Sequence, residues 1–196
     1  MLVRELMTPD PVTVSEDTPV KTALVLLFRH KITSMPVVGR HGRLSGVVSE
    51  ADLIRDLVRA DPRSHELTLD GEWDDRPVVV GDVMSAHAVT VHPDTELAQA
   101  VDLITSTTVK SVPVVDHDGA VKGMLSRSDV VRVLARADDE LARDIDALLE
   151  SVGLGDWMAE VTDGSVVLAG PEDARERALA HLVAGTVPGV VQICRD

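Results

Sequence analysis

The chain contains one segment twice, and this duplication restricts its possible folds more than any other feature. Residues 3–57 align without a gap with residues 80–134, at an offset of 77 residues, and 19 of the 55 aligned pairs are identical. Proline, glycine and aspartate recur at matching positions, as in SMPVV against SVPVV and GVVSEAD against GMLSRSD. A unit of about 55 residues buries too little surface to be stable by itself, so we expect two copies packed together around a shared core.

The pattern within each copy predicts the element order β-α-β-β-α. A short strand is expected at residues 12–14 and again at residues 89–91, followed by a helix for which Thr18 and Thr95 are the predicted N-caps. The apolar positions of this helix recur every three or four residues and form one buried stripe. They are Val20, Ala23, Leu24 and Leu27 in the first copy, and Leu97, Ala100, Val101 and Ile104 in the second.

A β-hairpin and a second helix complete each copy. In the first copy the strands are expected at residues 35–38 and 44–48, with a tight turn at His41-Gly42. The second helix is expected to begin after Ser49, and the same pattern returns 77 residues later, where the helix follows Ser126. The apolar face of the first such helix is expected to consist of Leu53, Ile54, Leu57 and Val58.

Composition narrows the possible classes of function. The chain has 19 Lys and Arg against 33 Asp and Glu, which gives a formal net charge of −14. Binding of DNA or RNA depends on basic side chains that neutralise phosphates, so we expect no nucleic-acid partner and no docking on an anionic membrane. One cysteine and no recognisable signal peptide indicate a reducing compartment, so we expect a cytoplasmic protein.

The sequence G-x-x-S-x-x-D lies at the junction of the return strand and the second helix in both copies, from Gly46 to Asp52 and from Gly123 to Asp129. Such a junction presents backbone N–H groups and a hydroxyl to a phosphate, and the carboxylate could accept both hydroxyls of a ribose. Serine followed three residues later by aspartate is also a capping box, which needs no ligand. The motif by itself supports both interpretations.

The order and repetition of these motifs resemble a CBS-domain pair, the tandem unit also named a Bateman module. The resemblance rests on the V-T-V, S-x-P-V-V and G-x-x-S-x-x-D segments and covers about two-thirds of the chain. It implies an α/β (α+β) fold with two β-α-β-β-α repeats packed as a pseudo-symmetric pair. The implied boundaries are repeat 1 at residues 1–58, a linker at 59–79 and repeat 2 at 80–137. Trp73, within the linker, is expected to pack against the pair.

The resemblance also implies a function and a set of binding residues. CBS pairs are regulatory modules that bind adenosine nucleotides such as AMP, ADP or ATP, act on a partner protein through conformational change, and assemble as homodimers. The implied residues of site 1 are Thr13, Ile32, Ser34, Pro36, Ser49 and Asp52. The implied residues of site 2 are Thr90, Val109, Lys110, Ser111, Pro113, Ser126, Arg127 and Asp129. Asp52 and Asp129 would bind the ribose hydroxyls.

The two implied sites differ in charge. Glu50 of the first copy corresponds to Arg127 of the second, and Thr33 corresponds to Lys110. A carboxylate repels a phosphate, whereas a guanidinium pairs with it. We therefore expect the site with Arg127 to prefer a nucleotide phosphate, and the site with Glu50 to be empty or to take a less charged adenosine compound.

Residues 138–196 depart from the repeat and predict an α-β-β-α-β order. A helix is expected from Asp138, a hairpin around Thr162-Asp163-Gly164, a second helix at residues 174–183 and a last strand at 190–193. The segments 161–170 and 187–191 resemble a BON domain, a family associated with binding lipids or partner proteins. We expect a small packing or interaction domain here.

No catalytic set or metal-binding set is recognisable in the sequence. The seven histidines are scattered, the single cysteine has no partner for a metal site, and the common nucleophile and phosphate-loop motifs are missing. We therefore expect no enzyme activity, no metal and no required cofactor. Two functions stay open: a nucleotide sensor, and a structural or protein-interaction module whose nucleotide sites are vestigial.

Overall fold

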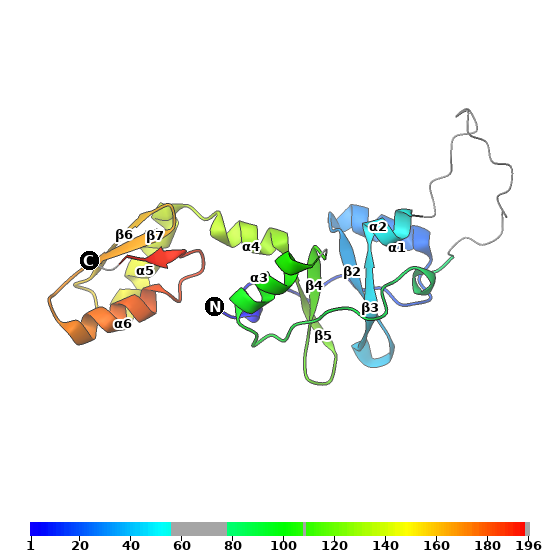
Figure 1. Cartoon of the computed structure of the whole chain (residues 1–196), viewed down its shortest axis with the longest axis horizontal. Helices are drawn as coiled ribbons and strands as arrows, with labels where there is room; N and C mark the ends of the chain where they lie inside the picture. The colour runs from blue at the N-terminus through cyan, green and yellow to red at the C-terminus, as the bar shows by residue number, and fades with distance from the viewer. Residues whose placement is uncertain (56–77, 108, 195–196) are drawn as a thin grey trace, which may run out of the picture. The chain divides into compact units, whose positions relative to one another are not determined.

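The computed structural model describes residues 1–55, 78–107 and 109–194 (Figure 1). The predicted apolar positions Leu57 and Val58 and the linker residue Trp73 lie outside these ranges. The chain divides into two compact units, Leu2–Ser126 and Arg127–Asp196, with Met1 grouped with the second. They are termed the N-terminal unit and the C-terminal unit below.

The described helices and hairpins follow the predicted order, and the predicted fold class is confirmed. The N-terminal unit contains η1 (Val3–Glu5), β1 (Thr8–Pro9), α1 (Val20–His30), β2 (Ser34–Val38), η2 (Arg40–Gly42), β3 (Leu44–Ser49), α2 (Glu50–Ile54), η3 (Val80–Asp82), α3 (Leu97–Ser106), β4 (Ser111–Val115) and β5 (Val121–Ser126). The C-terminal unit contains α4 (Arg127–Leu134), α5 (Asp138–Ser151), β6 (Met158–Thr162), β7 (Ser165–Ala169), α6 (Ala174–Ala184) and β8 (Gln192–Ile193). No helix in the described part of the chain is long and apolar enough to cross a membrane.

Helices α1 and α3 begin one residue later than expected, because the threonines predicted as N-caps close a different turn. Thr18 Oγ1 accepts a hydrogen bond from Ser15 N at 3.0 Å, and Thr95 Oγ1 accepts one from His92 N at 3.1 Å. The residues at the N-cap positions are Pro19 and Glu96. The two predicted threonine caps are therefore wrong.

The first predicted strand of each copy is reduced to a single parallel bridge. Val14 bridges Val37, and Val91 bridges Val114. Val14 N donates to Pro36 O at 3.1 Å, and Val38 N donates to Val14 O at 2.8 Å. Proline has no N–H to offer a neighbouring strand, but its carbonyl can still accept. The proline therefore fits the S-x-P-V-V segment without loss of this contact.

The hairpins β2–β3 and β4–β5 have the same antiparallel register. Ser34 lies opposite Ser49, and Ser111 lies opposite Ser126. Each hairpin also has an irregularity after its second-last pair, at Val37/Val38 and at Val114/Val115. This register brings the serine of S-x-P-V-V and the serine of G-x-x-S-x-x-D to the same end of each hairpin.

The two repeats exchange the segments that precede their first helices. Strand β1 belongs to the first repeat but pairs with β5 of the second, with Thr8 opposite Met124. In the reciprocal contact Ser85 pairs with Val47 of β3 through two backbone hydrogen bonds of 2.9 and 3.0 Å. Thr8 and Ser85 are equivalent in the alignment, as are Val47 and Met124, so the N-terminal unit has pseudo-twofold symmetry.

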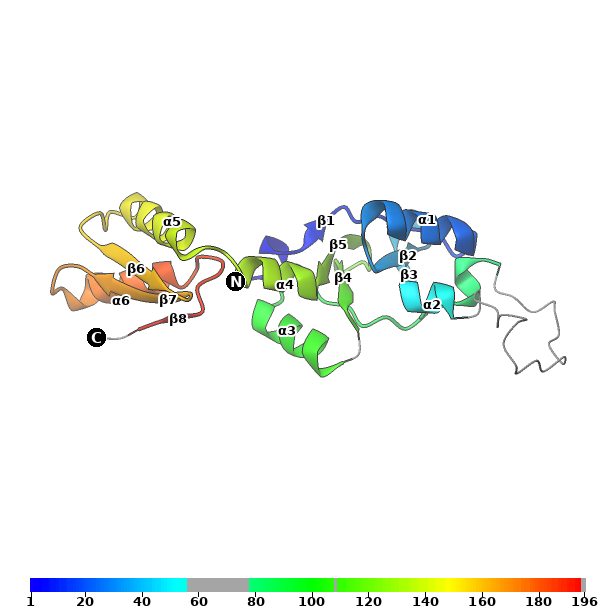
Figure 2. The same ribbon diagram turned by 90° about the horizontal axis from the view of Figure 1, so that it is seen from above.

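The exchange extends into the core of the first repeat. Val80 is fully buried and belongs to a cluster with eight residues of repeat 1: Val14, Val20, Ala23, Leu27, Met35, Val37, Val48 and Leu53. Helices α1 and α2 contact each other beside β2 and β3 (Figure 2). On the predicted apolar face of the second helix, Leu53 is buried, whereas Ile54 is 49% exposed.

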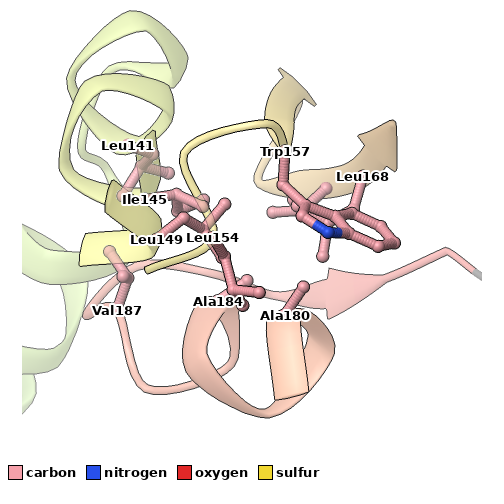
Figure 3. Close-up of a cluster of buried hydrophobic side chains, with 10 residues drawn as sticks. Leu141, Ile145, Leu149, Leu154, Trp157, Leu168, Ala180, Ala184 and Val187 are labelled. Atoms are coloured by element: carbon pink, nitrogen blue, oxygen red, sulfur yellow. The ribbon is translucent and has the colours of Figure 1, made fainter. Parts of the chain in front are cut away.

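The C-terminal unit has a three-stranded sheet of order β6-β7-β8, with α5 and α6 in contact with each other and with the sheet (Figure 1). Its core contains apolar residues from both helices and from β7, together with Trp157 (Figure 3). The hairpin loop is Asp163-Gly164, and both residues have positive φ, as a two-residue turn of this kind requires. The predicted α-β-β-α-β order is confirmed.

Candidate ligand-binding site

A cavity of about 370 Å³ lies within the N-terminal unit, where four segments of the two repeats meet. The first repeat contributes Thr33, Ser34, Val47, Ser49, Glu50, Ala51 and Asp52. The second repeat and the segment before it contribute Ser85, His87, Ala88, Val89, Val109, Lys110, Ser111 and Pro113. The wall combines hydroxyls and charged groups with valine, alanine and proline, as binding pockets for small molecules commonly do.

A hydrogen bond between two equivalent serines joins the repeats at this cavity. Ser34 Oγ and Ser111 Oγ are 2.5 Å apart, and the two residues are separated by 77 positions in the chain. This separation equals the offset of the repeat, so the bond lies on the pseudo-twofold axis of the unit. Both serines line the cavity, which makes the axis part of its wall.

The glycine of G-x-x-S-x-x-D has a packing role that explains its presence. A Cβ at position 46 would lie 2.5 Å from Ser85 O, and a Cβ at position 123 would lie 2.9 Å from Thr8 O. Side-chain carbons do not approach a carbonyl oxygen so closely. The exchanged segments can therefore pair with β3 and β5 only because these two positions lack a side chain.

The serine and aspartate of the first motif form a capping box at the start of α2. Ser49 N and Ser49 Oγ donate to Asp52 Oδ2 at 2.9 and 2.6 Å, and Asp52 N donates to Ser49 Oγ at 3.3 Å. The capping interpretation is thus confirmed for the first copy. Asp52 also lines the cavity, so the carboxylate that caps the helix is within reach of a ligand.

In the second copy the aspartate of the motif is more deeply buried. Asp129 is 5% exposed and accepts a hydrogen bond from Arg132 Nη2 at 2.7 Å. Both residues lie on α4, in the C-terminal unit. The equivalent pair in the first copy is Arg55 Nη2 and Asp52 Oδ1, at 3.9 Å.

An ion pair between the repeats lies in the cavity wall. Lys110 Nζ donates to Glu50 Oε1 at 3.0 Å, and the side chains are 65% and 46% exposed. An ion pair exposed to this degree contributes little to stability. Its main effect is on local charge, because the lysine of the cavity wall is balanced by a carboxylate before any ligand binds.

The cavity gathers residues from both predicted sites. Of predicted site 1, Ser34, Ser49 and Asp52 line it, whereas Thr13, Ile32 and Pro36 do not. Of predicted site 2, the residues that line this same cavity are Val109, Lys110, Ser111 and Pro113. Thr90 and Ser126 lie in the same unit but outside the cavity wall, and Arg127 and Asp129 belong to the C-terminal unit.

Sequence reasoning missed one wall of the cavity, formed by Ser85, His87 and Ala88. These residues belong to the segment that the second repeat exchanges onto the first. No local motif marks them, because their place depends on pairing between Ser85 and Val47. The described residues contain no group of three or more His, Cys, Asp or Glu side chains that could hold a metal ion.

Comparison with known families agrees with this architecture. The profile of the CBS domain matches residues 3–59 and 80–136, which together make up more than half of the chain. The chain therefore belongs to the CBS domain family and contains a tandem pair of these domains.

Relatives with similar sequences include proteins from archaea and plants. Uncharacterized protein MJ1426 of Methanocaldococcus jannaschii is 26% identical over 154 residues, which cover 68% of this chain and 91% of that protein. The chloroplastic CBS domain-containing protein CBSX2 of Arabidopsis thaliana is 35% identical over 135 residues, covering 61% of this chain and 56% of that protein. A homoserine O-acetyltransferase of Methanocorpusculum labreanum is 28% identical, but the match covers only 23% of that enzyme.

A solved structure of a relative contains a nucleotide. The crystal structure of CBSX2 in complex with AMP has 35% sequence identity with this chain and a TM-score of 0.56, and the match covers 67% of this chain and 93% of that one.

Proposed function

We propose that this protein is a regulatory module that binds an adenosine-type compound in the cavity of the N-terminal unit. The observation that carries the proposal is the composition of the cavity wall. Ser34, Ser49 and Asp52 offer hydroxyls and a carboxylate to a ribose, while Val89 and Pro113 offer apolar surface to a purine. The AMP complex of a relative with 35% identity supports the class of ligand.

The charges of the wall bear on which adenosine compound fits. Glu50 and Asp52 lie in the wall together with Lys110, and Glu50 already pairs with Lys110. A phosphate would have to compete with Glu50 for the ammonium group and would experience repulsion from both carboxylates. We therefore propose that this cavity prefers adenosine or a similar compound with little negative charge. The second site, with Thr90, Ser126, Arg127 and Asp129, stays a prediction from the family resemblance, with preference for a phosphate.

Titration of the purified chain with adenosine, AMP, ADP, ATP and S-adenosylmethionine tests the proposal, with native mass spectrometry and calorimetry as readouts. Asp52→Ala should abolish binding in this cavity. Asp173→Ala is the matched control, because Asp173 caps α6 through Arg175 N and Glu176 N and does not line the cavity. If no member of the panel binds at millimolar concentration, the sensor proposal is wrong, and a structural module with vestigial nucleotide sites becomes the better description.

The exposed helix surface of the first repeat supports a homodimer as part of this proposal. Phe28 on α1 is 86% exposed and is the only phenylalanine of the chain, and Val25 and Ile54 are also partly exposed. Large apolar side chains on helices that contact each other suit a second copy of the same surface. Analytical ultracentrifugation of the chain and of Phe28→Ser tests this assembly, since the variant should shift toward the monomer.

We further propose that this protein acts in the cytoplasm and that its role is binding rather than catalysis. The proposed domains are CBS repeats at residues 1–58 and 80–137 and a BON-like domain at residues 138–196. The order α5-β6-β7-α6-β8 and the tight Asp163-Gly164 hairpin support the BON-like resemblance. Ligand binding in the N-terminal unit would shift the population of this protein's own conformations. This shift would in turn alter the activity of a partner protein.

A further inference from the structure

A second cavity, of about 670 Å³, lies within the C-terminal unit and has a different character. Its wall is formed by the end of β7, one face of α6, and the residues Trp157 and Cys194. Among the described residues, the charged or titratable side chains of the wall other than Cys194 are Arg177 and His181, and no carboxylate belongs to it. This is unusual in a chain with 33 acidic residues and a net charge of −14.

Among the described residues, three other arginines of this unit form ion pairs with acidic side chains, and Arg177 does not. Arg132 pairs with Asp129 at 2.7 Å, Arg136 pairs with Asp144 at 2.5 Å, and Arg143 pairs with Asp139 at 3.2 Å. Within the described part of the chain, no carboxylate forms an ion pair with Arg177. Its guanidinium is therefore available to an anion from outside the protein.

His181 lies four residues after Arg177 on α6, so both side chains are on the same face of the helix. Ala174 and Ala178 are on the same wall, and Leu168 and Ala169 of β7 complete it. The small alanines leave room beside the sheet. The result is an apolar surface with one permanent positive charge and one further hydrogen-bonding group.

Trp157 is the largest side chain of the wall. Its side chain is 3% exposed and packs closely on Gly170, where any Cβ would collide with the indole ring. Figure 3 shows the ring between Leu168 and Ala180. The Nε1 atom is buried and has no hydrogen-bond partner among the described residues. An unpaired buried donor is rare in folded proteins and calls for an explanation.

We infer that this cavity binds a small apolar molecule that carries one carboxylate. The carboxylate pairs with Arg177, with His181 as a second hydrogen-bonding group, and the apolar part lies against Trp157, Leu168 and the alanines of α6. One guanidinium balances one negative charge, which favours a monoanion over a phosphate dianion. The volume lies within the range of about 300–1,000 Å³ that is common for small-molecule sites.

The tryptophan in the wall makes the inference directly testable. The chain has two tryptophans and no tyrosine, so Trp73→Phe in the full chain leaves Trp157 as the only tryptophan and the dominant fluorophore. Titration of this variant with octanoate should give a saturable change in Trp157 emission with a Kd in the millimolar range or below. Octylamine, which has the same chain and the opposite charge, should give no saturable change.

A pair of arginine substitutions then tests the role of charge. Arg177→Gln should weaken octanoate binding by about tenfold or more, because a charge-assisted hydrogen bond is lost. Arg175→Gln is the matched control, since Arg175 is exposed on the same helix and does not line the cavity. Arg177→Lys keeps the charge and should retain much of the affinity, which guards against a loss caused by misfolding.

Three results would overturn the inference: no saturable change with octanoate, equal binding of octylamine, or unchanged affinity in Arg177→Gln. The adenosine titration is independent of all three, because its cavity lies wholly within the N-terminal unit.

Discussion

At the scale of single residues, the glycines of the repeated motif matter for the fold as much as the serine and aspartate that attract attention as ligand groups. Gly46 and Gly123 have ordinary backbone conformations, and it is the carbonyl oxygens of Ser85 and Thr8 that exclude a side chain at these positions. The requirement is steric and holds whether or not a nucleotide binds.

Replacing either glycine by alanine should therefore destabilise the N-terminal unit. We expect Gly46→Ala and Gly123→Ala each to lower the free energy of unfolding by about 2 kcal/mol or more, because the contact is with backbone that cannot turn away. Gly155→Ala is the control, since a Cβ at that position would lie 3.9 Å from its nearest neighbour, the side chain of Glu150. Urea unfolding of the three variants checks this, and equal midpoints would contradict the packing role.

Asp116 gives the stability of the second hairpin a dependence on pH. Its carboxylate accepts hydrogen bonds from Ala120 N at 2.9 Å and Asp118 N at 3.0 Å, and it pairs with Lys122 Nζ at 3.1 Å. The hydrogen bond from Ala120, followed by the interaction with Lys122, lowers the pKa of Asp116 below its ordinary value.

Because the folded pKa is lowered, the carboxylate stabilises the fold above its unfolded pKa, and this contribution is lost as the pH falls through the folded value. Asp116→Asn should therefore be less stable than the unsubstituted chain at pH 7, with a difference that shrinks as the pH is lowered toward and below the pKa of an ordinary aspartate. Thermal unfolding of both proteins across this range is the measurement. A difference that stayed constant with pH would show that charge plays no part.

At the scale of elements, the C-terminal hairpin is held by a side chain from a distant helix. Asp138 at the start of α5 accepts hydrogen bonds from Asp163 N at 2.7 Å and Gly164 N at 2.9 Å. These two N–H groups belong to the loop between β6 and β7. One carboxylate thus fixes the helix relative to the turn.

Removal of this carboxylate should loosen the hairpin. Asp138→Ala is expected to cost about 1 kcal/mol of stability, comparable to the loss of a helix cap. Asp139→Ala is the neighbouring control, because the side chain of Asp139 forms an exposed ion pair with Arg143, and its loss should be nearly neutral. Hydrogen exchange at residues 158–169 should increase in the first variant alone, and equal exchange in both would refute the link.

Local patterns in the sequence were enough to predict most elements but not their ends. The spacing of apolar residues and the turn residues were enough to predict the two strands of each hairpin. They also predicted the glycine turns and the order α-β-β-α-β of the C-terminal unit. The helix starts were wrong because Thr18 and Thr95 accept hydrogen bonds from residues before them, a choice that a capping pattern cannot distinguish. The first strands were overestimated because each makes only one bridge.

At the scale of the whole molecule, the reciprocal exchange of segments was beyond prediction from sequence, because it pairs residues far apart in the chain. The same exchange explains what was incomplete in the predicted site. Ser34, Ser49 and Asp52 of predicted site 1 line one cavity with Val109, Lys110, Ser111 and Pro113 of predicted site 2, and residues of the segment 85–89 complete its wall. The family motif assigns binding residues to each repeat separately, whereas residues of both repeats line the cavity.

The exchange of segments also predicts which repeat is destabilised by a substitution in the core. Val80 lies at the start of the second repeat but is buried in the core of the first. Val80→Ala should cost about 2 kcal/mol, from lost burial and a residual cavity, and should raise hydrogen exchange in β2 and β3 more than in β4 and β5. Val3→Ala is the symmetric partner and should have the reverse effect. The exchange of segments would be contradicted if Val80→Ala raised hydrogen exchange mainly in β4 and β5, or if Val3→Ala raised it mainly in β2 and β3.

Reciprocal pairing has a consequence for a chain cut between residues 56 and 77. Each fragment would keep a segment that only the other can use: β1 for β5, and Ser85 for Val47. Neither half could complete its own sheet, yet together they hold every strand that the structure describes. Two such fragments, produced separately, should reassociate on mixing into a complex with native-like spectra, whereas the covalent connection of the intact chain gives the two repeats a high effective concentration.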